Sequence, residues 1–267
     1  MRSVRAVSFD FARLLSLARV AALLLAGGAT AARGAELPPA PAVSTFAPVD
    51  DLLAYVDECL TDFAPVLASA ESFDRGTSRL EKDANSLAAV ALALHLHDQD
   101  HRLKHHAGVM CKAAQKLAAA AAAVDYAAAQ DAWQALQAAQ RGETSAVPEM
   151  TWQPAGEMGI VMKQVTLLHG KLKRGARPGP RFDTGAEENA RMATVLAALA
   201  QCTQADVPRG TSAADTIKWY DLCAEMRDVC GETSRAFHAR DPAATAAALE
   251  RVEHNCTACH DVFRKQP

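Results

Sequence analysis

The order of hydrophobic and polar residues predicts helices along most of this chain of 267 residues. From about residue 48 onward, apolar residues recur at intervals of three and four, the period of one face of an α-helix. Alanine is abundant, aromatic residues make up only 5% of the chain, and alternation of β-branched with polar residues is missing. The sequence therefore predicts an all-α fold, with helices near residues 48–69, 78–98, 101–124, 126–141, 154–174, 185–204, 213–239 and 242–264.

Short polar motifs indicate where several of these helices begin. Ser78–Glu81 and Thr184–Glu187 have the spacing of a capping box, in which the first and last residues satisfy each other's backbone N–H groups. Asp125 is a predicted N-cap, and so is Asp241, which is followed by a proline at the first helical position. The Gly- and Pro-rich segment Arg174–Pro180 is predicted to break the chain between two helices.

Eight helices are too many for one four-helix bundle, and they suit two. We therefore expect two tandem up-down four-helix bundles, covering residues 46–145 and 150–267. A shift of 116 residues places Asp125 on Asp241, which indicates that the bundles are diverged copies of one another. The alternative is that Ala-rich helices share only an amphipathic composition.

The first 35 residues resemble an export signal more than part of a fold. Val20–Ala31 is a short apolar stretch, too short to span a bilayer, and small residues that suit a cleavage site follow it. A basic segment precedes it, with Arg2, Arg5, Arg13 and Arg19. We expect residues 1–35 to be a signal peptide, residues 36–45 to be a Pro-rich tether, and the mature protein to be periplasmic or otherwise exported, without a membrane span.

The last predicted helix carries the most specific motif of the chain, Cys256-Thr257-Ala258-Cys259-His260. Residues three and four apart lie on the same face of a helix, so both cysteines and the histidine can point at one flat ligand. Cys-x-x-Cys-His is the attachment pattern of c-type haem. Two thioether bonds would hold the porphyrin edge, and His260 would bind the iron as its proximal ligand.

A zinc site and a redox-active dithiol are the competing interpretations of this motif. Structural zinc takes four ligands, commonly from two such pairs, and the chain has no second Cys-x-x-Cys at a usual spacing. A thioredoxin-like dithiol needs a βαβ setting, which the helical pattern does not provide. The sequence therefore favours one covalently bound haem c.

The motif and its surroundings also resemble a known family. Cys-x-x-Cys-His-x-x-Phe-Arg close to the end of a helical chain resembles the class II cytochromes c, the cytochrome c prime group, over roughly residues 152–265. The resemblance implies a four-helix bundle that binds one haem through its last helix, and attachment outside the inner membrane. It also implies that Arg264 pairs with a haem propionate, although a solvated arginine at a helix end is nearly as common. Phe263 is most simply a core residue. The shift of 116 places Gln140 at the position of Cys256, so the first bundle would be a haem-less repeat.

The predicted helix 154–174 carries the candidate for a second iron ligand. Its apolar stripe contains Met162, and Val161-Met162-Lys163 resembles the low-spin branch of the family, in which methionine is the sixth ligand. Met158 and His169 are alternative ligands on the same helix, and Met162 as a plain core residue, with no sixth ligand, remains open. The full stripe consists of Met158, Val161, Met162, Val165, Leu168 and Leu172.

The two ligation states predict different functions. Iron bound by His260 and Met162 is coordinatively full and suits single-electron transfer. Five-coordinate iron would leave one face open to NO or CO, as the high-spin branch of the family implies, and the protein would then bind or sense a gas. A third possibility is a module in which haem has only a structural role. No nucleophile–base pair or phosphate-binding loop stands out, so we do not expect an enzyme.

Net charge restricts the expected partners. The formal charge falls from −3 to −7 without residues 1–35, because five arginines and one aspartate leave with them. Such a chain is a poor partner for nucleic acid and suits redox partner proteins with a positive surface. We also expect either a homo-oligomer or a pseudo-dimer within one chain, with the first bundle in place of the second subunit of dimeric relatives.

The remaining cysteines and a group of histidines are weaker candidates. Cys59, Cys111, Cys202, Cys223 and Cys230 are expected to be buried free thiols, with Cys202–Cys223 the least implausible disulfide. Five histidines between residues 95 and 106 could in principle share copper or zinc, but a solvated helix end explains them more simply.

Overall fold

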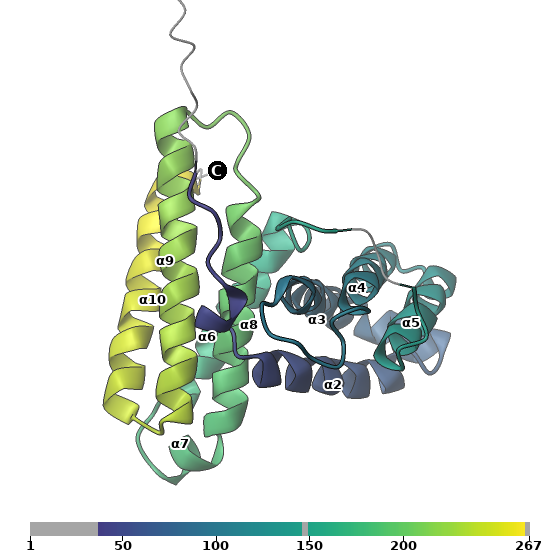
Figure 1. Cartoon of the computed structure of the whole chain (residues 1–267). Helices are drawn as coiled ribbons and strands as arrows, with labels where there is room; N and C mark the ends of the chain where they lie inside the picture. The colour runs from purple at the N-terminus through teal and green to yellow at the C-terminus, as the bar shows by residue number, and fades with distance from the viewer. Residues whose placement is uncertain (1–36, 146–148, 265–267) are drawn as a thin grey trace, which may run out of the picture. The chain divides into compact units, whose positions relative to one another are not determined.

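The computed structural model describes residues 37–145 and 149–264, and all the regular structure in these ranges is helical (Figure 1). The prediction of an all-α fold is confirmed. The predicted signal peptide, residues 1–35, lies outside the described residues. A short 3₁₀ helix and nine α-helices follow one another: η1 (Val43–Thr45), α2 (Val49–Val66), α3 (Ala70–Leu96), α4 (Ala107–Ala122), α5 (Tyr126–Gln140), α6 (Met158–Gly175), α7 (Pro180–Thr184), α8 (Ala186–Gln204), α9 (Ala213–His238) and α10 (Pro242–Phe263).

Both predicted capping boxes are wrong. Helix α3 begins at Ala70, where the Ser69 hydroxyl accepts a hydrogen bond from the Ser72 backbone N–H at 3.1 Å, so Ser78 lies inside the helix. Gly76 lies inside this helix and lets it pack closely on α2, because a Cβ atom at this position would lie 2.6 Å from Cγ1 of Val66. The second predicted capping box, Thr184–Glu187, also fails, because its threonine ends the short helix α7. Helix α8 then starts after Gly185 without a side-chain cap.

The two aspartate caps are confirmed, and they lie in matching turns. Asp125 accepts a hydrogen bond from the Ala128 N–H at 3.0 Å, and Asp241 accepts from two N–H groups in the first turn of α10. Each aspartate follows a residue with left-handed backbone, Val124 with φ 54° and Arg240 with φ 53°. Helices α4 and α9 end two residues before these positions, so the turns correspond at a shift of 116 residues.

Residues 38–145, which we call the first half, pack their four helices as neighbours in sequence: α2 on α3, α3 on α4, and α4 on α5. Helix α3 is the centre of this group, and almost every residue of its second part is buried. The first turns of α5 attach to the end of α2, because the Tyr126 hydroxyl donates to the Leu67 carbonyl at 3.1 Å. The Tyr126 ring also packs on Phe73, with ring centroids 5.5 Å apart.

Residues 149–264, which we call the second half, follow a similar order. Helix α8 packs on α9 along much of its length, α9 packs on α10, and α6 packs on α8 (Figure 1). Helices α6 and α10 approach each other much less closely than these pairs. The chain reverses direction between α6 and α8, between α8 and α9, and between α9 and α10, so α6 and α10 run in opposite directions (Figure 1).

The two halves contact each other through their first two long helices. Helices α2 and α6 each pack on both α3 and α8, and α3 also contacts α8. The described residues from Pro38 onward form one compact unit. The contact pattern is therefore reciprocal, with the first long helix of each half lying against the second long helix of both.

A buried carboxylate joins the halves at this contact. Asp51 of α2 is only 6% exposed, and its Oδ2 accepts hydrogen bonds from the hydroxyls of Thr194 at 2.7 Å and Ser234 at 3.1 Å. Nε2 of His238 lies 3.0 Å from both carboxylate oxygens of Asp51, and Nδ1 of the same ring lies 3.2 Å from Glu187. All three side chains that contact the Asp51 carboxylate, Thr194, Ser234 and His238, belong to the second half.

None of the helices in residues 37–145 and 149–264 is both long enough and apolar enough to cross a lipid bilayer.

Candidate functional site

Helix α10 is buried along one face only as far as Asn255. Asp241 caps its first turn, and the residues that face the core repeat at helical spacing up to this asparagine: Thr245, Ala248, Leu249, Val252 and Asn255. From the next residue to Arg264 no residue is fully buried. Cys256 and Cys259 are partly exposed, and His260 is exposed. The predicted attachment motif thus occupies the part of the helix that contributes least to the core.

Contacts with α9 fix the rotation of α10 about its axis. The Asn255 amide donates to the Leu222 carbonyl at 3.1 Å, one residue before the first cysteine of the motif. At the end of the helix, the Phe263 ring meets Trp219 edge to face, with centroids 5.0 Å apart and an angle of 82°. Phe263 is therefore partly buried against α9 and is not the core residue that the sequence predicted.

Helix α6 has two different apolar faces. Val161, Leu168 and Leu172 are buried, and between them the Gln164 amide donates to Asp83 of α3 at 3.1 Å, so this face lies against the core. The rest of the predicted stripe is only half buried. His169, one turn further along the helix, is also half buried. We call these four residues the half-exposed face of α6: Met158, Met162, Val165 and His169.

A salt bridge shows that the half-exposed face of α6 is directed toward α10. Nζ of Lys173 lies 2.8 Å from Oε2 of Glu253. Met162 precedes Lys173 by eleven residues, about three full helical turns, so both side chains leave α6 in nearly the same direction. His260 follows Glu253 by seven residues, about two turns, and shares its direction in the same way.

The same salt bridge sets the relative heights of these residues. At about 1.5 Å per residue, Met162 lies about 16 Å from Lys173 along α6, and His260 lies about 10 Å from Glu253 along α10. Because the two helices are antiparallel, both displacements have the same sense (Figure 1). Met162 therefore lies about 6 Å beyond the level of His260, with Val165 close to that level.

His169 lies on the other side of this level and has an unusual environment. Its Nε2 atom is buried and has no hydrogen-bond partner among the described residues. Burial lowers the pKa of His169 below its usual value, and the nearby Lys173 ammonium lowers the pKa further. His169 therefore has a buried ring nitrogen without a partner, on the half-exposed face of α6.

The acidity of the two motif cysteines distinguishes between the possible chemistries. Burial raises the pKa of Cys256, with a further contribution from Glu253, and burial raises the pKa of Cys259 to about 11. Redox-active dithiols have lowered thiol pKa values instead, because the thiolate is the reactive species. No group of three or more His, Cys, Asp or Glu residues suitable for a metal ion occurs within residues 37–145 and 149–264. Neither the zinc nor the dithiol interpretation gains support.

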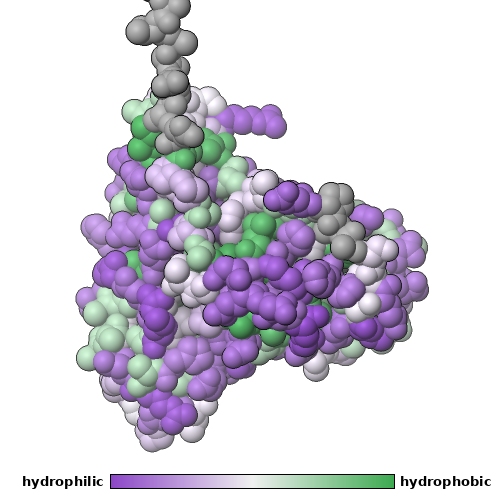
Figure 2. Space-filling view, viewed as in Figure 1, coloured by the Kyte–Doolittle hydropathy of each residue, from purple (hydrophilic) through white to green (hydrophobic). Residues whose placement is uncertain are grey.

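Hydrophobic surface gathers at the end of the molecule where α9 begins and α10 ends (Figure 2). Ile217 and Val262 are the large apolar residues exposed there, at 38% and 40% of their surface. No residue of α9 before Trp219 is buried, so the first turn of this helix lies outside the core. Arg264 ends α10, where its backbone N–H donates to the His260 carbonyl at 3.1 Å, and its side chain is exposed.

The cysteines outside the motif and two histidines of the group between residues 95 and 106 have structural roles. All seven cysteines are free thiols, and the five outside the motif are buried, which confirms that expectation. The solvated helix end predicted for the histidine group is wrong for His97, which is 1% exposed and places Nε2 3.1 Å from the Ala47 carbonyl. His101 places Nε2 2.8 Å from the Leu94 carbonyl. His97 thus pairs with a backbone carbonyl just before α2, and His101 pairs with one at the end of α3.

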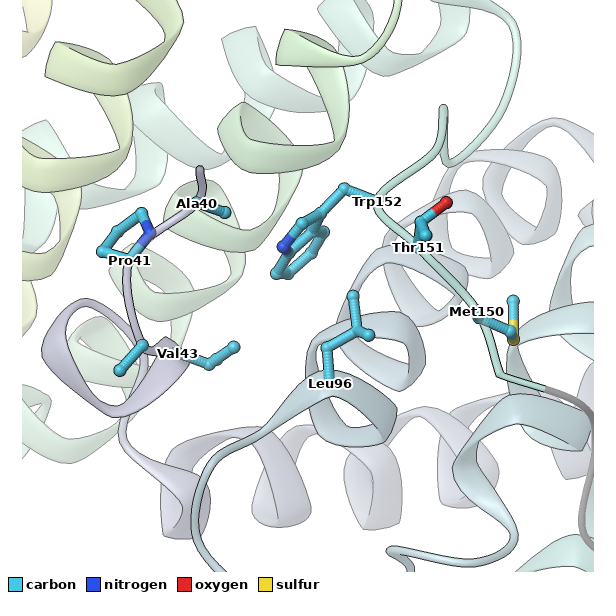
Figure 3. A pocket seen from close by; sticks show the side chains of 8 residues that line it. Ala40, Pro41, Val43, Leu96, Met150, Thr151 and Trp152 are labelled. Atoms are coloured by element: carbon cyan, nitrogen blue, oxygen red, sulfur yellow. The ribbon is translucent and has the colours of Figure 1, made fainter. Parts of the chain in front are cut away.

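A pocket of about 400 Å³ was not foreseen from the sequence (Figure 3). It lies between the segment at residues 40–43 and the segment at residues 150–152, with Leu96 at the end of α3 beside it. The Trp152 indole points into this space (Figure 3). The lining contains no titratable side chain, so the pocket offers shape and apolar contact without reactive groups.

Comparison with known proteins finds no protein-family model, no curated protein and no solved structure that matches this chain.

Proposed function

We propose that this protein is an exported c-type cytochrome that binds one haem c covalently and carries single electrons. The observation that carries the proposal is the pairing of two features on two helices that a salt bridge joins. The Cys-x-x-Cys-His motif begins where α10 stops being buried, and the half-exposed apolar face of α6 is directed toward it. Apolar side chains left half exposed on two facing helices suit a large flat hydrophobic ligand.

The residues present fit such a group. Cys256 and Cys259 are free, protonated thiols, the form whose S–H groups add across the two vinyl groups of the porphyrin. His260 is exposed beside the second anchor and is the proximal ligand. Met162 is the proposed second ligand, and the other apolar residues on the half-exposed face of α6 would exclude water from the bound group. The bound iron supplies the change between two oxidation states.

The tandem arrangement belongs to the same proposal. The second half is a four-helix bundle of α6, α8, α9 and α10, and the first half is a haem-less copy of it. The matching turns at Asp125 and Asp241 support the duplication. The reciprocal contacts of α2 and α6 support a pseudo-dimer within one chain.

Partner proteins would dock near the exposed end of α10. The apolar surface at Ile217 and Val262 lies close to the motif, and an expected charge of −7 for the mature chain would steer a positively charged redox partner toward the protein. Arg264, exposed at the end of the helix, is available to a haem propionate.

A gas-binding haem protein is the alternative, and one observation favours it. Within the half-exposed face of α6, Val165, which offers no sulfur or nitrogen donor, lies closest to the level of His260, and Met162 is about 6 Å further along. If α6 does not shift, the iron keeps an open face that NO or CO could occupy.

Electrochemistry on the intact exported protein tests the proposal. Protein matured in a host with haem-attachment machinery should show a c-type absorption spectrum and one reversible single-electron wave. The Cys256→Ala/Cys259→Ala variant should lose both, whereas Cys223→Ala/Cys230→Ala, which removes two buried thiols of α9, should keep both. A colourless wild-type protein would contradict the proposal. A coloured protein whose ferric iron binds NO at an open site would support the gas-binding alternative.

A further inference from the structure

His169 is the one residue of the half-exposed face of α6 with a buried nitrogen that no group in the described structure binds. Its Nε2 atom is buried without a hydrogen-bond partner, although an unsatisfied buried nitrogen costs about 1–3 kcal/mol. Glu253 is the acidic residue of α10 whose charge acts on this ring, and it is already paired with Lys173. Filling of the core alone does not explain why a polar ring occupies this position.

Along the helix axes, the backbone of His169 lies close to the level of His260, the proposed proximal ligand. It precedes Lys173 by four residues, about 6 Å along α6, whereas His260 lies about 10 Å from Glu253 in the same sense. The backbone level of His169 is therefore about 4 Å from that of His260, and Met162 is about 6 Å away on the other side.

The direction of the side chains favours the histidine further. In an α-helix each Cα–Cβ bond is tilted toward the N-terminus. On α6 this direction moves the His169 ring toward the level of His260, whereas it moves the Met162 side chain away from that level. The two donors thus lie on opposite sides of the level of His260, and the histidine side chain is tilted toward that level.

We propose that His169 is a second distal donor for the haem iron and binds it whenever Met162 does not. This inference rests on the proposed function, because it needs a haem attached at Cys256 and Cys259. It gives the site two interchangeable ligands of different character: a thioether, which favours reduced iron, and an imidazole, which favours oxidised iron more than the thioether does.

Ligand replacement in the full chain tests the inference. In Met162→Leu, we expect the ferric iron to remain low-spin with the electron-paramagnetic-resonance signature of two imidazoles. The far-red absorption band of methionine-bound ferric haem should be lost, and the reduction potential should fall. In the double variant Met162→Leu/His169→Leu, the iron should become high-spin, and the reduced protein should bind CO. Met110→Leu, which changes a buried methionine of α4 in the first half, is the matched control and should leave the wild-type spectrum unchanged.

Each outcome decides the inference. High-spin iron in Met162→Leu would show that His169 does not bind, and so would low-spin iron in the double variant. If the wild-type protein already has the signature of two imidazole ligands, and His169→Leu loses that signature, then His169 binds the iron even when Met162 is present. Intact mass separates these results from failure of the proposed function: chains without added haem would overturn both, whereas haem-bearing chains with the wrong ligands overturn only the role of His169.

Discussion

Helices α5 and α10 occupy the same place in the two halves, and they differ in where they end. Both begin with an aspartate cap after a left-handed residue. At a shift of 116 residues their buried positions coincide: Ala129, Ala132, Leu136 and Ala139 in α5, and Thr245, Ala248, Val252 and Asn255 in α10. Helix α5 then ends at Gln140, the counterpart of Cys256, whereas α10 continues to Phe263.

The residues that pack in the core and the residues of the proposed haem-attachment motif therefore occupy different parts of α10. The shared part of the two helices builds a core, and the additional two turns of α10 add the Cys-x-x-Cys-His motif without adding a fully buried residue. In the first half, the end of α5 is instead tied to α2, because the Gln140 amide donates to Asp57 at 3.2 Å. In the second half the corresponding link is the Lys173–Glu253 pair, which joins α10 to α6 before the motif begins.

The largest expected effect follows from shortening α10 to the length of α5. A chain that stops after Asn255 should bind no haem at all. Its unfolding free energy should stay within about 1.5 kcal/mol of the haem-free full chain, because the edge-to-face contact of Phe263 with Trp219 is the main packing lost. Urea denaturation measures this, with full-length Cys256→Ala/Cys259→Ala as the haem-free reference. Global unfolding of the shortened chain would show that the last two turns do contribute to the core.

Uncoupling the halves should have the next largest effect. Asp51→Ala removes the carboxylate that three side chains of the second half bind, and it leaves the buried hydroxyls of Thr194 and Ser234 with only each other as partners in this group. We expect a loss of about 3 kcal/mol in unfolding free energy. The exposed neighbour variant Asp50→Ala is the control and should change stability by less than about 1 kcal/mol. Equal effects of the two substitutions would mean that the contact between the halves contributes little.

The matching caps should have matching effects. Asp125→Ala and Asp241→Ala each remove a side chain that accepts hydrogen bonds at a helix start, and each should cost about 1 kcal/mol. Thermal unfolding of the two variants under one set of conditions measures the difference between them. A cost at only one of the two sites would argue against equivalent turns in the two halves.

The smallest expected effect concerns the left-handed residues. Val124→Gly and Arg240→Gly should each raise the unfolding free energy by up to about 1 kcal/mol, because glycine adopts positive φ without a steric penalty. The gain should be larger for the β-branched Val124. Ala123→Gly, at a neighbouring residue with right-handed backbone, should lower stability instead and serves as the control.

Local chemistry made much of the fold predictable. The eight long helices were expected near their observed positions because apolar spacing and alanine content act within a few residues, and Asp125 and Asp241 cap through neighbouring N–H groups. The start of α3 was missed because Gly76 resembles a helix end until Val66 is seen packed against it.

The candidate site was predictable only in part. Cys256, Cys259 and His260 form a compact motif, so the sequence alone could single them out. The unpaired Nε2 of His169 depends on how α6 lies against α8 and α10, which no local pattern encodes. The same is true of Asp51, whose partner His238 is 187 residues away along the chain.

The most direct test of the account is the mass of one peptide. Trypsin should release residues 252–264 from protein matured with haem-attachment machinery, since arginine precedes this segment and ends it. The account predicts that this peptide carries one haem and that neither of its cysteines reacts with a thiol reagent. The bare peptide with two reactive thiols would contradict the central claim.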